Sequence, residues 1–303
     1  MFKHVLIATD CRDGLERLAQ CLDALQEGGI QTVSFVHSLD WKEESGGIPE
    51  DRTPEIEAVE AQIRKSAGAL PQGMTFRVWV QVCKPSVAIQ NAIKEYRPDV
   101  LLLGMSTRNF LVEKLFGSTT MELLPRLEIP VLVVRPQMIA TFTLEELRLR
   151  CRNLFRCILL PYDFSKGAGD LLNYLVNRLA VLDPTPQIKT LYLLHVVDPS
   201  SRVNQTRGQA EAQNKAEKQL NQIESAMGSR LSQGQVKGLV RTGSPVKEIL
   251  AAASDLDMTA IAMASRNAGR FWEWSTPSTT GEILRQSWHS VLFFPPQKTK
   301  TQA

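Results

Sequence analysis

The sequence lacks the features that mark nucleic-acid-binding, membrane-spanning and secreted proteins. Its 35 Lys and Arg residues nearly balance its 32 Asp and Glu residues, and a net charge of +3 gives no reason to expect a nucleic acid or an anionic membrane as partner. No apolar run approaches the roughly 18 residues that a membrane-spanning helix needs. The apolar stretch within residues 1–10 is too short for a signal peptide, so we expect a cytoplasmic protein.

Signs of metal or catalytic chemistry are equally scarce. Five cysteines without a CxxC pair favour reduced thiols, and four histidines in or beside predicted strands favour structural roles. There is no GxxxxGK[ST] loop, no GxGxxG after a strand, no HExxH and no GxSxG. We therefore expect no catalytic residues, no metal ligands and no enzyme.

What the sequence does contain is one pattern that occurs twice. An apolar run ending in aspartate occupies residues 5–10 and again 158–163. A second run ending in histidine occupies residues 32–37 and again 190–195. The separation between matching positions grows by a few residues through the early loops, which is typical of duplication followed by drift.

Each copy is predicted to be an α/β domain with a doubly wound parallel sheet. Unbroken apolar runs such as Val100–Leu103 and Ala260–Met263 indicate strands that helices cover on both faces. Leucines at helical spacing, as at residues 15–25, lie between them. This pattern predicts five strands and four helices per copy, and we expect the strand order 3-2-1-4-5. The predicted parts are a first domain at 1–137, a linker helix at 138–153, a degenerate second domain at 154–297 and a disordered tail at 298–303.

The linker is predicted to be a short amphipathic helix that lies over the junction of the two copies. Thr143 with Glu146 forms a plausible capping box. Four residues follow at one-face spacing, namely Leu144, Leu147, Cys151 and Leu154. The cations of this helix are expected to form a solvated face, and they are Arg148, Arg150 and Arg152.

Polar or small residues stand where the first and fourth strands of each copy end. Asp10 and Asp163 end the first strands, and Gly104 and Ala264 end the fourth strands. In open parallel sheets, ligands bind at the carboxyl ends of the strands where the strand order reverses. With the expected order, each pair faces one crevice.

From Gly104 the first copy continues Met105-Ser106-Thr107 and, after nine residues, Gly117-Ser118-Thr119 before a helix. This resembles the universal stress protein family, whose nucleotide-binding members carry Gly-x-x-Gly, nine residues, then Gly-Ser/Thr. The resemblance covers nearly the whole chain apart from the linker and the tail. It implies a stress-response protein with ATP or AMP in the first domain.

In that family the aspartate ending strand 1 contacts the ribose, the backbone after the strand 2 histidine contacts adenine, and the glycines with Ser/Thr hold the phosphates. Glycines let the backbone approach a phosphate, and a helix N-terminus offers free N–H groups. The matching positions of the first copy are Asp10, Ser38, Gly104, Thr107, Gly117, Ser118 and Thr119.

Both copies depart from the family pattern. Thr107 stands at the second glycine and adds bulk inside the phosphate loop. In the second copy Ala264, Asn267 and Pro277 replace all three glycines, and Pro277 also lacks an N–H. We therefore expect any ATP in the first copy.

Other interpretations of these residues stay open. Thr119 with Glu122 and Thr279 with Glu282 form capping boxes that need no ligand. The aromatic loop at 270–274 is open to four interpretations: it packs within the domain, stacks on a ligand, fills the space that a phosphate would take, or binds a protein partner.

We expect a non-catalytic nucleotide-binding or regulatory module, with ATP hydrolysis absent or very slow because no water-activating residue is visible. The alternative is an interaction protein without nucleotide in either copy, and its protein partner is unidentified. Family members dimerise through their last strands, and the apolar runs at 131–134 and 291–294 would leave exposed edges. The resemblance therefore implies an intramolecular pseudo-dimer, and a homodimer is a further expectation.

Overall fold

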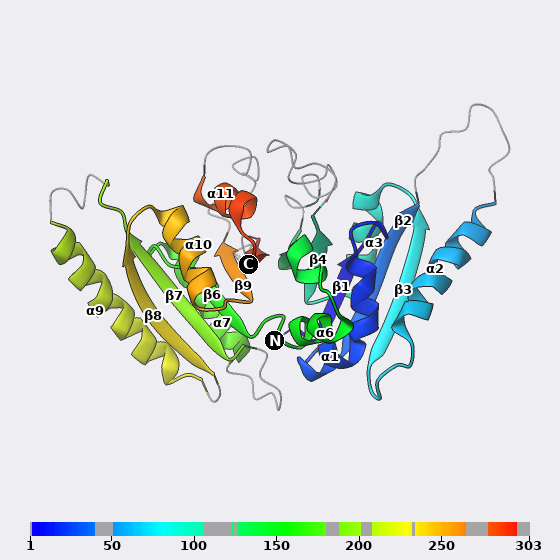
Figure 1. Ribbon diagram of the computed structural model, residues 1–303, viewed down its shortest axis with the longest axis horizontal. Helices are drawn as coiled ribbons and strands as arrows, with labels where there is room; N and C mark the ends of the chain where they lie inside the picture. The colour runs from blue at the N-terminus through cyan, green and yellow to red at the C-terminus, as the bar shows by residue number, and fades with distance from the viewer. Residues whose placement is uncertain are drawn as a thin grey trace, which may run out of the picture. The chain divides into compact units, whose positions relative to one another are not determined.

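The computed structural model describes residues 2–39, 51–105, 123, 127–179, 188–200, 208–231, 234–264 and 278–295. It divides into two units, one of residues 2–152 and the other from residue 153 onward. The first unit runs from blue to green in Figure 1, and the second runs from green to red. No helix within the described ranges is long and apolar enough to cross a membrane.

The described part of the first unit contains five strands in the order β3-β2-β1-β4-β5, and these pairings are parallel. Their bounds are β1 His4–Ala8, β2 Thr32–Leu39, β3 Thr75–Val82, β4 Val100–Gly104 and β5 Val131–Val134. All four residues of β5 are buried, as are the first four of β4. Burial on both faces explains why these strands are unbroken apolar runs rather than alternating ones.

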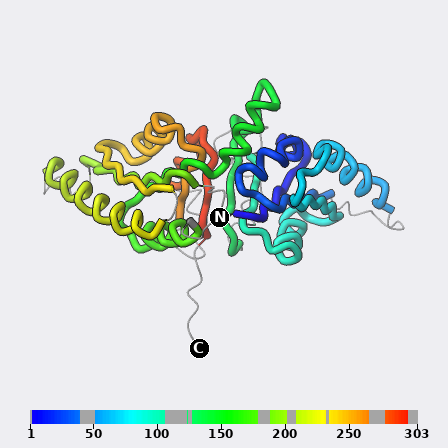
Figure 2. Tube along the Cα trace, turned by 90° about the horizontal axis from the view of Figure 1, so that it is seen from below, coloured from blue at the N-terminus to red at the C-terminus, as the bar shows by residue number. Residues whose placement is uncertain are grey.

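Helices cover both faces of this sheet (Figure 2). The helices that the structure describes in this unit are the 3₁₀ helix η1 Leu15–Cys21, α1 Leu22–Glu27, α2 Thr53–Ala67, α3 Pro85–Tyr96, α5 Pro136–Ile139 and α6 Leu144–Arg152. The leucine spacing predicted a helix through residues 15–25, and the chain instead begins that segment as a 3₁₀ helix. Its three residues per turn place Leu15, Leu18 and Cys21 on one face, and all three are fully buried.

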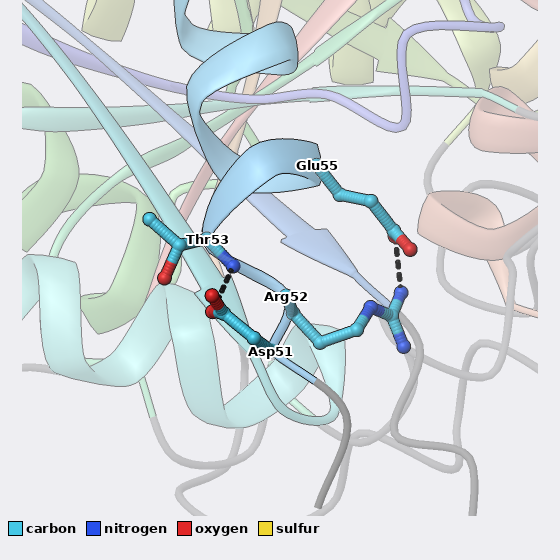
Figure 3. Close-up of polar contacts among 4 residues, drawn as sticks. All are labelled: Asp51, Arg52, Thr53 and Glu55. Carbon is cyan, nitrogen blue, oxygen red and sulfur yellow. Dashed lines mark hydrogen bonds and ion pairs between the residues drawn. The ribbon is translucent and has the colours of Figure 1, made fainter.

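The start of α2 shows how a polar sequence begins a helix locally (Figure 3). The backbone N–H of Thr53 donates to Asp51 Oδ1 at 3.0 Å, and Arg52 forms an ion pair with Glu55 at 2.5 Å. The hydrogen bonds from Thr53 hold the pKa of Asp51 below its usual value. Both contacts occupy the first turn, where acidic side chains favour a helix.

The second unit repeats the same arrangement. Its strands are parallel in the order β8-β7-β6-β9-β10, so the strands take the same relative places as in the first unit. The strand bounds are β6 Cys157–Pro161, β7 Thr190–Val197, β8 Gln235–Thr242, β9 Ala260–Ala264 and β10 Ser290–Phe294. The helix bounds are α7 Lys166–Leu179, α9 Gln209–Gly228, α10 Pro245–Asp255 and α11 Thr279–Gln286. The chain is therefore an α/β protein whose sheets are parallel.

The linker forms two short helices where one was predicted. It consists of α5 and α6, which pack against η1 and α1 of the first unit, and α6 ends at Arg152. Leu147 and Cys151 supply its buried face. The Thr143 cap is present, since Glu146 N donates to Thr143 Oγ1 at 3.2 Å.

The arginines of α6 form a solvated face, as predicted, since the side chains of Arg148 and Arg152 are 42% and 47% exposed, but they also make polar contacts with neighbouring helices. Arg148 pairs with Asp23 and Arg152 pairs with Glu27, so both arginines join α6 to the carboxylates of α1. Arg150 donates to the carbonyl of Gln137. These partners lie on α1 and α5, so the periodicity of residues 144–152 alone could not predict the contacts.

Candidate functional site

The candidate site lies where β1 and β4 end side by side in the first unit. These strands pair in parallel with Ala8 opposite Leu103, which brings the segment after β1 against Gly104 at the end of β4. Of the predicted site residues, the structure describes Asp10, Ser38 and Gly104. The others lie outside the described residues, namely Thr107, Gly117, Ser118 and Thr119.

Asp10 shapes the turn that leaves β1. Its Oδ1 accepts the backbone N–H groups of Arg12 at 2.8 Å and Asp13 at 2.9 Å. Cys11, directly after Asp10, takes a left-handed conformation with φ 57°. Asp10 itself is exposed, so Oδ2 can face solvent or a ligand while Oδ1 holds the turn.

The second copy has the same turn after β6. Asp163 Oδ1 accepts the N–H of Ser165 at 3.0 Å, and Phe164 has φ 59°. Asp10 and Asp163 therefore share a structural role that needs no ligand, besides any role at a ligand.

Asp13 is a residue of this site that the sequence reasoning missed. Its Oδ1 accepts the hydroxyl of Thr9 at 2.7 Å and the N–H of Leu15 at 3.0 Å. Its Oδ2 lies against Gly104, because a Cβ built at Gly104 would stand 2.6 Å from that oxygen. The space that a glycine leaves at the end of β4 is thus filled by a carboxylate.

The environment of Asp13 favours its neutral form. Burial raises its pKa to about 6, and the nearby charges of Asp10 and Glu16 act in the same direction. The hydrogen bonds from Thr9 and Leu15 act against this rise. The corresponding residue of the second copy, third after the strand-ending aspartate, is Lys166. That contrast between the copies is the signal that could have drawn attention to Asp13.

Ser38 lies near the end of β2, paired with Gln81 of β3. Its hydroxyl donates to the carbonyl of Cys83. The side chain is therefore engaged within the protein, which leaves its backbone as the group that could meet a ligand.

The histidine that precedes it has a structural bond that recurs in both copies. His37 Nδ1 donates to the carbonyl of Thr9 at 2.9 Å, and His195 Nδ1 donates to the carbonyl of Tyr162 at 2.8 Å. A carbonyl only accepts, so Nδ1 carries the proton in both rings. Each bond ties the second strand of its copy to the segment after the first strand.

Cys11 lies beside His37, with Sγ 3.7 Å from Nδ1, but this pair is poorly suited to nucleophilic chemistry. Burial, followed by the charge of Glu16, raises the pKa of Cys11 to about 11. A thiol with so high a pKa is almost entirely protonated at neutral pH, whereas catalytic cysteines need the thiolate. Within the described residues no three metal-ligand side chains gather either.

Different side chains stand at the corresponding strand ends of the second unit. Ala264 ends β9, and Phe164 contacts both Tyr162 and His195, with ring centroids 5.3 and 4.7 Å apart. Aromatic side chains thus cover the end of β6, where the first unit has Asp13 and Cys11. Asn267 and Pro277 lie outside the described residues.

The cap of α11 corrects one prediction. Ser278, rather than Thr279, is the N-cap, and its Oγ accepts the N–H of Gly281 at 3.1 Å. The predicted pairing of Thr279 with Glu282 was therefore one residue out of register. Glu282 is the fourth residue of the helix, whereas a capping box uses the third.

Comparison with known proteins gives a consistent assignment. The model of the universal stress protein family matches residues 1–135 and 154–295. A universal stress protein from Archaeoglobus fulgidus DSM 4304 aligns over 97% of this chain and 97% of its own, with a TM-score of 0.61 and 19% identity. A putative universal stress protein from Pseudomonas aeruginosa UCBPP-PA14 aligns over 98% and 94%, with a TM-score of 0.58 and 14% identity. No curated protein matches the chain. At these identities the two structures show the shared fold alone.

Proposed function

This chain belongs to the universal stress protein family as a tandem of two copies, and we propose that it is a non-catalytic regulatory module that binds an adenine nucleotide in its first copy. The observation that carries the proposal is the meeting of the Asp10 turn with Gly104 at the ends of neighbouring strands. That is where ligands bind in sheets whose strand order reverses. The second copy has Ala264 at the corresponding strand end and aromatic rings over the neighbouring one.

The non-catalytic part of the proposal rests on the chemistry of the described site. The thiol beside His37 is protonated at neutral pH, and the histidine proton is directed at a carbonyl. Neither group is poised to activate a water molecule or to attack a phosphate. We expect phosphate release from ATP to stay below about 1 s⁻¹, a typical low enzyme rate.

One observation favours the alternative, an interaction protein without nucleotide. The carboxylate of Asp13 occupies the space beside Gly104 into which a phosphate would approach. A negative charge there opposes a negatively charged ligand. In this second candidate the crevice is closed and the protein acts only through a protein partner.

Calorimetric titration of the full chain with ATP at pH 6 distinguishes the two candidates. The proposal expects one nucleotide per chain, with AMP as a competing ligand. Two nucleotides per chain would contradict the assignment to the first copy, and the absence of binding would favour the interaction protein.

Three expectations stay predictions of the sequence: the intramolecular pairing of the strands at 131–134 and 291–294, a homodimer, and a cytoplasmic location.

A further inference from the structure

We propose that Asp13 gates the first copy for phosphate: as a carboxylate it repels the phosphates of a nucleotide from Gly104, and as a neutral acid it admits them. This inference rests on the proposed function and adds its regulation. Nucleotide binding in the first copy then strengthens as the pH falls, with no rearrangement of the fold.

The geometry places the carboxylate at the critical point. Thr9 and Leu15 fix Oδ1 with hydrogen bonds of 2.7 and 3.0 Å, so the side chain cannot swing freely out of the crevice. Oδ2 is thereby held over Gly104, within 2.6 Å of the position of an added Cβ. A phosphate that approached the backbone at Gly104 would meet this oxygen.

The charges that act on Asp13 reinforce the gate. Asp10, on the same turn, and Glu16, on η1, both disfavour its ionised form. Cys11 is protonated, and therefore uncharged, at neutral pH. On the side of β4, Asp13 lies against Gly104, which has no charged side chain. Asp13 therefore changes charge at about pH 6, well above the usual range for an aspartate.

Two basic side chains of the first unit, Arg17 and Arg135, have contacts elsewhere. Arg17 donates to the carbonyl of Ile139 at 2.7 Å, which directs it toward α5. Arg135 follows β5 and contacts Met105 Sδ at 2.5 Å. Among the described residues, the charged groups that act on the pKa of Asp13 are Asp10 and Glu16, and both are acidic.

The second copy contains no such gate. Lys166 takes the place of Asp13 and is exposed, while Ala264 takes the place of Gly104. The carboxylate and the glycine occur together in the first copy and are both absent from the second. Their joint occurrence is consistent with the contact between them, since a Cβ at Gly104 would collide with Asp13.

The test is calorimetric titration of the full chain with ATP and with adenosine, at pH 5.5 and pH 7.5. For the wild type we expect ATP affinity to rise at least about tenfold on acidification, because a like charge within a few ångströms opposes each phosphate. Adenosine carries no phosphate, and its affinity should not change.

Asp13→Asn mimics the neutral acid and should bind ATP at pH 7.5 as the wild type does at pH 5.5. The phosphates of ATP also titrate, and this variant shows their contribution alone. Subtracting the pH dependence of the variant from that of the wild type leaves the contribution of Asp13. Asp13→Ser serves as a second uncharged variant, and circular dichroism checks that both fold. Glu57→Gln is the control: it removes an exposed carboxylate on α2, outside the candidate site, and should keep both the ATP affinity and its pH dependence.

The outcomes separate the gate from the proposed function. If the wild type binds ATP and the uncharged variants show the same affinity and pH dependence, the gate is wrong and the proposed function stands. If no variant binds ATP at either pH, both are wrong. If the uncharged variants bind ATP at pH 7.5 and the wild type does not, both the gate and the proposed function are supported.

Discussion

Replacing Asp13 by asparagine should stabilise the folded protein at neutral pH. Burial raises the pKa of this carboxyl from 3.8 to about 6, so the folded state holds the proton more tightly than the unfolded state does. Stability from this group is therefore greatest at low pH and is lost as the pH rises from 3.8 to 6. At about 1.4 kcal/mol per pKa unit, the ionised carboxylate costs the fold about 3 kcal/mol at pH 7.5.

Asparagine removes that cost and can keep the acceptor that Thr9 and Leu15 use. We expect Asp13→Asn to raise the free energy of unfolding by about 1–3 kcal/mol at pH 7.5, the upper figure being the full cost of ionisation. At pH 4.5 the advantage should shrink by roughly two-thirds, because the wild type is then itself protonated when folded.

Urea unfolding at the two pH values measures this difference, with Glu57→Gln on α2 as the control for loss of an exposed carboxylate. A variant that is less stable than the wild type at pH 7.5 would refute the reasoning. So would a difference of equal size at both pH values, because it would show that ionisation of Asp13 is not the cause.

Three further substitutions, two of them paired with a control on the same helix, test the packing and capping by urea or thermal unfolding. Gly104→Ala places a Cβ 2.6 Å from the neighbouring carboxylate oxygen and should cost about 1–3 kcal/mol, whereas an unchanged stability would mean that the contact is absent. Leu147→Ala should cost about 2–4 kcal/mol, while Leu149→Ala, 57% exposed on the same helix, should change stability by less than about 0.5 kcal/mol; equal losses would contradict the packing of α6. Ser278→Ala should cost about 1 kcal/mol and Thr279→Ala only a few tenths, and the reverse order would restore the original assignment of the cap.

The fold was accessible from sequence because its information is local and repeated. Apolar runs such as 100–103 and 260–263 became buried parallel strands, β4 and β9, as their composition predicted. The 3₁₀ geometry of η1 was not accessible, because leucines at residues 15, 18, 22 and 25 fit both helix types. The ion pairs of α6 were missed because their carboxylates, on α1, are more than a hundred residues away.

The candidate site was predictable in part for the same reason. Topology alone places the Asp10 turn beside Gly104, since parallel strands end at the same edge of the sheet. The position of Asp13 depends instead on the left-handed Cys11 and on two hydrogen bonds within one turn. Spacing in the sequence does not encode that geometry.

Photolabelling of the full chain tests the central claim, adenine-nucleotide binding in the first copy, most directly. The protein is irradiated with 8-azido-ATP at pH 6, with and without excess unlabelled ATP, and digested for peptide mapping by mass spectrometry. We expect ATP-protected labelling only in peptides from residues 2–152. Protected labelling of peptides beyond residue 153, or labelling that excess ATP does not suppress, would contradict it.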